Sequence, residues 1–262
     1  MPIRARHLAA VALAVTASAA RAELVTRTVE YRQGDTVLEG YLAYDTSGPA
    51  KKPGVLVFHQ FTGVSGYEKK RAEQLAALGY VAFAADVYGK GVRPTARAEA
   101  GAEAGKYRAN RPLLRARAQA ALAALRQQPN VRSEKVVAIG YCFGGGAALE
   151  LARSGADVLG VVSFHGSLTT PMPQDAKNIR GKVLVLHGAE DPHAPRADVL
   201  ALEDELTKGG ASWEVVLYSG AVHAFTQPDA GNDRSKGVAY DAQADRRSWE
   251  RMKDFLDELF AS

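Results

Sequence analysis

VVAIGYCFGGGAALELAR, residues 136–153, joins a short β-branched run, a glycine-rich turn and a helical segment. Cys142 lies in the turn between Gly140 and Gly144, in a G-x-C-x-G pattern. This pattern is typical of a sharp strand-to-helix turn that presents a nucleophile, with cysteine in the place of the more usual serine. Glycine suits both flanking positions, because a side chain there would crowd the strand and the helix. The stretch therefore predicts Cys142 as a nucleophile at a helix N-terminus, where a thiolate is favoured.

Other interpretations of this stretch are weaker. A buried structural cysteine is the ordinary alternative, but the order strand, turn, helix favours the nucleophile. The glycines do not spell G-x-G-x-x-G, and Gly-Lys-Ser or Gly-Lys-Thr does not occur, so neither dinucleotide binding nor a P-loop is predicted. Cys142 is the only cysteine among 262 residues and so cannot form an intramolecular disulfide.

Strand-like and helical segments alternate on both sides of the turn. Strands are expected at residues 36–44, 54–58, 81–85, 136–139, 158–164, 183–186 and 213–217. Helices are expected at 67–78, at 95–128 with a break near 110–112, at 147–153 and 197–208, and over 249–260. This alternation predicts an α/β fold with a mostly parallel central sheet and helices on both faces. Without a repeat or long linker, residues 23–262 are expected to form one domain.

The first 22 residues have the composition of an export signal. They contain arginines but no acidic residue, an apolar run at 8–20, and an A-x-A site that ends at Ala22. The apolar run is shorter than the roughly 20 residues that a membrane span needs. We expect cleavage after Ala22 rather than an uncleaved anchor. The protein would then be exported, to the periplasm if the source is a Gram-negative bacterium and to the medium otherwise.

The net charge of +4 comes largely from this segment. The whole chain has 33 basic and 29 acidic residues; without the three arginines of the signal, 30 remain against 29, a net of +1. The overall charge therefore gives no reason to expect a nucleic-acid partner. No later stretch is long and apolar enough to span a bilayer, so we expect no membrane partner after signal cleavage. The sequence does not indicate an oligomeric state.

A nucleophile of this kind needs a general base, and the base needs a carboxylate that fixes its tautomer. Asp191 follows the strand expected at 183–186, and His223 follows the strand expected at 213–217. Both should lie at the carboxyl edge of the sheet together with Cys142. The order nucleophile, acid, histidine is that of the α/β-hydrolase fold.

Neighbouring residues offer alternatives for both roles. Glu190 could replace Asp191 as the acid, and His187 or His193 could replace His223 as the base. The cluster has no recognisable metal-ligand spacing, so no metal site is predicted. Another cluster, the basic run Arg108, Arg111, Arg115 and Arg117, is expected to form a solvated helix face.

Five segments resemble the dienelactone hydrolase (carboxymethylenebutenolidase) family of α/β-hydrolases: GYCFGG at 140–145, GAEDPHAP at 188–195, AVHAF at 221–225, HQFTGV at 59–64 and DVYGK at 86–90. The resemblance covers essentially the whole chain after residue 22. It implies Cys142 as the nucleophile, His223 as the base and Asp191 as its orienting acid. It also implies an oxyanion hole made of the backbone N–H groups of Phe143 and Phe61, with a small-molecule ester or lactone as substrate and no cofactor.

The chain departs from the family pattern in its substrate-binding loops. Where the family has a glutamate that takes part in thiol activation, the matching residue is Gln60, which cannot accept a proton. The two arginines that hold a substrate carboxylate match Lys90 and Gln227, and Lys90 lacks the bidentate fork of an arginine. Tyr88 is a further candidate for shaping the substrate pocket. We therefore expect this chain to share the fold and the reaction type of the family, but not necessarily its substrate.

We therefore expect a hydrolase that forms a thioester on Cys142 and is fastest on activated esters or enol lactones. A broad-specificity secreted carboxylesterase is one alternative. The other is a catalytically silent α/β-hydrolase scaffold used for binding.

Overall fold

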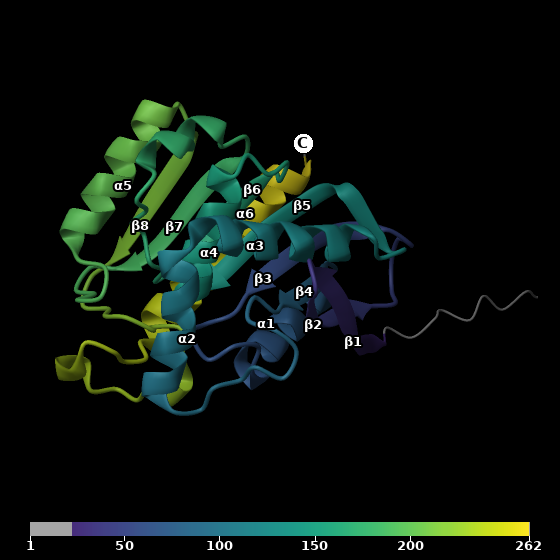
Figure 1. The fold of residues 1–262 in the computed structure, drawn as a ribbon, viewed down its shortest axis with the longest axis horizontal. Coiled ribbons are helices and arrows are strands. Elements are labelled where there is room, and N and C mark those ends of the chain that lie inside the picture. Colours follow the sequence, from purple (N-terminus) through teal and green to yellow (C-terminus); the bar gives the residue numbers. More distant parts are fainter. Residues whose placement is uncertain (1–22, 262) are drawn as a thin grey trace, which may run out of the picture.

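The computed structural model describes residues 23–261 (Figure 1). The predicted export signal, residues 1–22, lies outside this range. The described strands are β1 (Leu24–Gln33), β2 (Thr36–Asp45), β3 (Lys52–Phe58), β4 (Val81–Ala85), β5 (Val131–Tyr141), β6 (Gly160–Phe164), β7 (Lys182–Gly188) and β8 (Trp213–Tyr218). The described helices are α1 (Gly66–Ala77), α2 (Arg97–Ala109), α3 (Arg111–Arg126), α4 (Phe143–Arg153), α5 (Arg196–Gly209) and α6 (Ala242–Ala261), with short 3-10 turns at Pro173–Asn178, Pro228–Ala230 and Arg234–Lys236.

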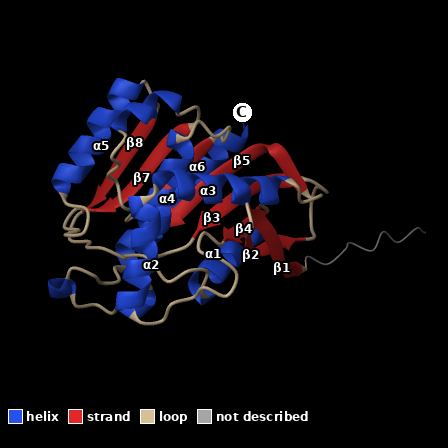
Figure 2. Ribbon diagram, in the orientation of Figure 1, coloured by secondary structure: helices blue, strands red, loops and turns tan. Residues whose placement is uncertain are grey.

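The strands form one sheet with the order β1-β2-β4-β3-β5-β6-β7-β8. The strands from β4 to β8 pair in parallel, while β1 and β2 form an antiparallel hairpin whose second strand pairs antiparallel with β4. Helices lie on both faces of the sheet (Figure 2). The predicted α/β fold with a mostly parallel sheet is confirmed. Strand β1 was not predicted, because most of its residues are exposed and polar and give no apolar run.

Each buried strand supplies side chains to two apolar cores, one on either face. On β3, Leu56 and Phe58 face the core that α2 to α5 cover, while Val55 and Val57 face the core beneath α1 and α6. This explains why β3 is a continuous apolar run, as expected of a strand that is covered on both sides.

The site is positioned at the point where the strand order reverses. From β3 the chain first adds β4 on one side, and only later places β5 on the other side of β3. The loops that follow β3 and β5 therefore diverge from neighbouring strands, which is where α/β sheets usually leave a crevice for a ligand.

The turn after β5 is held by backbone contacts too close for side chains. A Cβ atom on Gly140 would lie 2.0 Å from the carbonyl oxygen of Gly144, and one on Gly144 would lie 2.3 Å from that of Phe58. Cys142, between them, has a φ of 55° and forms the N-cap of α4. Such a conformation is costly for a residue with a side chain, and it persists only where the surroundings enforce it.

Replacing Gly144 with alanine should therefore destabilise the fold. We expect Gly144→Ala to lower the free energy of unfolding by roughly 3 kcal/mol, because two backbone segments must move apart. Urea denaturation followed by circular dichroism measures the change. Gly105→Ala is the matched control: its Cβ would meet no atom within 4 Å in helix α2, so it should stabilise the protein by about 0.5–1 kcal/mol. Equal effects of the two substitutions would contradict this account of the turn.

Candidate functional site

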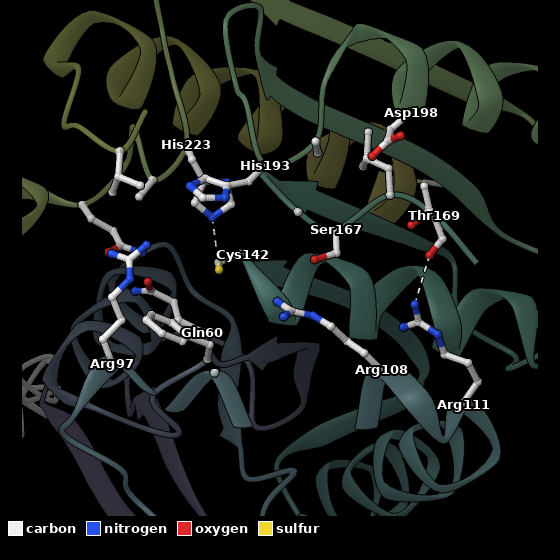
Figure 3. Close-up of a pocket in the computed structure, with 18 residues that line it drawn as sticks. Gln60, Arg97, Arg108, Arg111, Cys142, Ser167, Thr169, His193, Asp198 and His223 are labelled. Carbon is white, nitrogen blue, oxygen red and sulfur yellow. Dashed lines mark hydrogen bonds between the residues drawn. The ribbon is translucent and has the colours of Figure 1, made fainter. Parts of the chain in front are cut away.

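A cavity of about 470 Å³ opens where the loops after β3, β5, β6, β7 and β8 meet the N- and C-terminal parts of α2. Cys142 and His223 line it, together with Gln60 from the loop after β3. Figure 3 shows the sulfur of Cys142 below the ring of His223, with the two joined by a hydrogen bond. The cavity therefore contains the residue types that acyl transfer requires.

A chain of hydrogen bonds runs from the sulfur to a buried carboxylate. His223 Nε2 lies 3.2 Å from Cys142 Sγ, and His223 Nδ1 lies 2.8 Å from Asp191 Oδ2. The other carboxylate oxygen, Oδ1, accepts the backbone N–H groups of His193 at 2.8 Å and Ala194 at 3.2 Å. Because both oxygens of Asp191 are engaged, its direction is fixed, and the Nδ1–H of His223 is kept toward it. Nε2 then faces the sulfur.

The alternative acid and bases have other surroundings. Glu190 is exposed to solvent. The buried His187 hydrogen-bonds the carbonyl oxygen of Ala194 through Nε2, at 2.8 Å. His193 does line the cavity, with its ring edge-on to His223 at a centroid distance of 5.0 Å. The structure thus brings His223 and Asp191, rather than these residues, into line with Cys142.

The charges of this chain favour an ionised thiol. Burial opposes ionisation of Cys142, but the charge and hydrogen bond of His223 and the backbone N–H of Phe143 bring the pKa of the thiol below its ordinary value. Burial likewise works against a charged His223, yet the thiolate and the hydrogen bond to Asp191 raise the pKa of the imidazole well above its ordinary value. Both shifts point to a thiolate–imidazolium pair as the resting form.

Two backbone N–H groups are available at the cavity. Phe143 is the first residue of α4, next to Cys142, and its backbone N–H contributes to the lowered pKa of that thiol. Phe61 lines the cavity from the loop after β3, and its N–H has no hydrogen-bond partner within residues 23–261. These are the two groups that the sequence analysis expected at an oxyanion hole.

Two of the four candidate substrate-binding residues line the cavity, and the other two do not. Gln60 and Gln227 line the cavity. Tyr88 is buried, and its hydroxyl donates to the carbonyl oxygen of Phe61 at 3.0 Å. Lys90 is outside the described lining: its half-exposed ammonium forms an ion pair with Glu30 on β1. Because β1 was missed in the sequence, this partner of Lys90 was missed as well.

Positive charge reaches the cavity from helices α2 and α3 instead. Arg97, Arg108 and Arg111 line it, and Figure 3 shows the guanidinium groups of Arg97 and Arg108 on opposite sides of Cys142. Neither of these two forms an ion pair or hydrogen bond with another residue of the described chain. Asp198 is the acidic residue with a side chain at the same wall.

The expectation that the basic run forms a solvated face is wrong for most of its members. Arg111 and Arg117 are buried, and Arg111 donates to the carbonyl oxygen of Thr169 at 3.1 Å. Arg115 pairs with Glu150 at 2.8 Å and with Asp175 at 2.6 Å. The exposed Arg108 faces the cavity. One signal was present in the sequence: Arg97 and Arg108 are 11 residues apart, three turns of one helix at 3.6 residues per turn, and so share a face.

Within residues 23–261, no group of three or more His, Cys, Asp or Glu side chains is placed to hold a metal ion. None of the helices in that range combines the length and apolar character needed to cross a bilayer.

The comparisons with known proteins agree on one family. The model of the dienelactone hydrolase family matches residues 38–260. A Synechocystis protein named "Putative carboxymethylenebutenolidase" is 28% identical over 90% of this chain and 98% of its own length.

Solved structures extend this likeness to the fold. The structure named m3DLH superposes with a TM-score of 0.87 at 39% identity, over 90% of this chain and 98% of its own. A dienelactone hydrolase-like promiscuous phosphotriesterase from metagenomic libraries gives a TM-score of 0.86 at 42% identity, with the same coverage. With a family match over most of its length and relatives this similar, the chain belongs to the dienelactone hydrolase family.

Proposed function

We propose that the protein hydrolyses carboxylic esters or lactones through a thioester on Cys142. The observation that carries this proposal is the continuous chain Cys142 Sγ, His223 and Asp191, with separations of 3.2 Å and 2.8 Å, at a cavity that Phe61 also lines with a free backbone N–H. The relative from Synechocystis supports it by name, since a carboxymethylenebutenolidase acts on a lactone.

The first half-reaction transfers the acyl group to sulfur. The thiolate of Cys142 attacks the carbonyl carbon, a C–S bond forms, and the carbonyl electrons move onto oxygen. The N–H groups of Phe143 and Phe61 stabilise that oxyanion. When the intermediate collapses, the bond to the leaving oxygen breaks and His223 gives that oxygen the proton held on Nε2. The thioester and a neutral His223 remain.

The second half-reaction returns the enzyme to its resting form. Neutral His223 takes a proton from water, and the resulting hydroxide attacks the thioester carbonyl. Collapse of this second intermediate breaks the C–S bond and releases the acid and the thiolate. Asp191 stays ionised throughout and orients the ring, consistent with the lowered pKa of its carboxyl: burial raises that pKa, but the hydrogen bond and charge of His223, the charge of His187 and the backbone N–H of His193 together outweigh the burial.

The leaving group decides whether the first half-reaction goes forward. A thiolate is itself a good leaving group, with an ordinary pKa near ~8.5, so the first intermediate tends to expel sulfur and return to substrate. Phenolates and enolates leave more easily than alkoxides. The site therefore suits aryl esters and enol lactones better than simple alkyl esters.

The positive charge at the cavity indicates which esters or lactones would bind best. Arg97 and Arg108 line the cavity, and neither guanidinium has an ion pair or hydrogen bond within residues 23–261, although that of Arg108 lies over the ring of Phe143 at 5.9 Å from its centroid. Gln227 adds a neutral polar side chain. A guanidinium binds a carboxylate through parallel hydrogen bonds. We propose that esters or lactones carrying an anionic group at a distance from the scissile bond bind better than neutral ones.

The nucleophile is tested by its removal. We expect Cys142→Ala to reduce hydrolysis of 4-nitrophenyl acetate at least about 10³-fold, because no acyl-enzyme can form. The release of 4-nitrophenolate measures the rate, and intact-protein mass spectrometry of wild type should detect the added acetyl group. Ser167→Ala is the matched control, because its hydroxyl lines the same cavity; it should keep most of the activity. Undiminished hydrolysis by Cys142→Ala would remove Cys142 as the nucleophile, and an inactive wild type would favour a silent scaffold.

The thiolate pair is tested by its pH dependence. Because the pKa of Cys142 is lowered, thiolate should persist at a pH below ~8.5, the ordinary midpoint of a thiol. The rate of alkylation by iodoacetamide should therefore increase with pH and reach half its maximum at a pH below the ordinary midpoint of a thiol. In His223→Ala the effect of burial on the thiol is no longer offset by the imidazole, so the midpoint should move to higher pH than in wild type. Identical profiles for the two proteins would show that His223 does not ionise the thiol.

The anionic preference is tested with 4-acetoxybenzoate and its neutral methyl ester. Arg108→Ala should raise KM for the anion roughly tenfold, the equivalent of one charge-assisted hydrogen bond of about 1.4 kcal/mol, and leave KM for the methyl ester nearly unchanged. Arg97→Ala should act in the same direction. Arg132→Ala is the control, because this exposed arginine lies at the opposite end of β5. An equal change of KM for both esters would rule out charge recognition.

A further inference from the structure

We infer that His59 is a positioning residue that orients the backbone N–H of Phe61 toward the reacting carbonyl oxygen. This inference rests on the proposed function, since it assigns a role within acyl transfer. His59 is fully buried and directly follows β3. It is not among the residues that line the described cavity, so it acts through the loop rather than on the substrate.

The hydrogen bonds of His59 fix its tautomer. The backbone N–H of Val87 lies 3.1 Å from Nε2. Because a backbone N–H can only donate, Nε2 must carry the lone pair, and the ring hydrogen of the neutral form is on Nδ1. Nδ1 then donates to the carbonyl oxygen of Gln60. Burial lowers the pKa of His59, which keeps the ring neutral and this donor and acceptor assignment in place.

The carbonyl of Gln60 and the N–H of Phe61 belong to one peptide unit. In a trans peptide these two groups lie in one plane and point in opposite directions, and the described chain contains no cis peptide bond. His59 therefore fixes the direction of the Phe61 N–H by holding the opposite end of its peptide. The N–H of Gly63 donates to the same carbonyl at 3.3 Å, so the loop turns back on itself at this point.

Two other side chains hold the neighbouring peptide groups. Glu68, a buried residue of α1, accepts the backbone N–H of Gln60 at 3.1 Å. Its second oxygen accepts from the N–H and the hydroxyl of Ser65, at 2.8 Å and 2.6 Å. Tyr88 donates its hydroxyl to the carbonyl oxygen of Phe61. The polar backbone groups around the Phe61 N–H are thus satisfied, and this N–H is left free.

The ring of His59 also connects the two expected oxyanion donors. It stacks on the ring of Phe143 at a centroid distance of 5.7 Å and meets the edge of Tyr88 at 4.5 Å. Phe143 supplies the second N–H from the first turn of α4. One buried imidazole therefore contacts both segments, so that the spacing of the two donors depends on its shape as well as on its hydrogen bonds.

The experiment compares two reactions of the same sulfur. Hydrolysis of 4-nitrophenyl acetate passes through an oxyanion, whereas alkylation of Cys142 by iodoacetamide does not. His59→Leu removes both hydrogen bonds of the ring. We expect it to reduce kcat/KM for the ester roughly 10- to 100-fold, somewhat less than complete loss of an oxyanion donor, and to change the alkylation rate and its pH midpoint less than about twofold.

Two additional variants keep the test decisive if His59→Leu folds poorly. His59→Asn retains an amide N–H near the position of Nδ1 and should recover part of kcat/KM. Tyr88→Phe keeps the ring but loses the hydroxyl that holds Phe61, and should lower kcat/KM by a smaller factor, again without affecting alkylation. Parallel losses of hydrolysis and alkylation, or no loss of hydrolysis, would overturn the role of His59. Failure of the proposed function appears separately, as Cys142-independent hydrolysis or an inactive wild type.

Discussion

The close approach of α4 to the sheet at Gly140 and Gly144 is the constraint on which the site depends. These two glycines let the first turn of α4 lie against the ends of β3 and β5: the carbonyl oxygen of Phe58 approaches Gly144, and the carbonyl oxygen of Gly144 approaches Gly140. The chain must then turn within a single residue, and Cys142 takes the positive φ that this requires. As a result, the sulfur projects from the edge of the sheet, with the first N–H of α4 beside it.

The electrostatics follow from this placement. A buried thiol beside an unpaired imidazole would stay neutral, because an isolated charge in a poorly solvated place is costly. Here the charge on sulfur is balanced by His223, and the charge on His223 is balanced by Asp191, itself held by two backbone N–H groups. The free-energy cost of burying each charged group is thus offset by the opposite charge or the hydrogen bonds of its neighbour. Under the proposed mechanism, the pair is formed before substrate arrives, and little reorganisation is needed when the thiolate attacks.

Local sequence patterns were sufficient for the fold and for the line-up of Cys142, Asp191 and His223. These residues lie in the loops that follow β5, β7 and β8, so their position at the carboxyl edge follows from the parallel sheet alone. The failures involve contacts between distant segments. Lys90 was expected at the substrate, but it pairs with Glu30 on a strand whose exposed, polar residues give no strand signal. Arg111, Arg115 and Arg117 were expected to face solvent, but they are buried or paired with residues of distant segments, and helical periodicity does not contain that information.

Two cavity arginines, Arg97 and Arg108, lie on α2, whereas the reacting groups lie elsewhere, and these two parts of the protein differ in how readily they accept substitutions. The reacting groups and the backbone donors lie on the sheet edge and on α4, where glycines and buried side chains leave little room for substitution. Helix α2, by contrast, buries only Ala100, Ala104 and Tyr107, and its cavity-facing arginines are exposed. New side chains on this helix could alter the accepted substrate while the hydrolytic machinery stays as it is. The residues proposed to select the substrate thus lie on a different helix from the groups proposed to react with it.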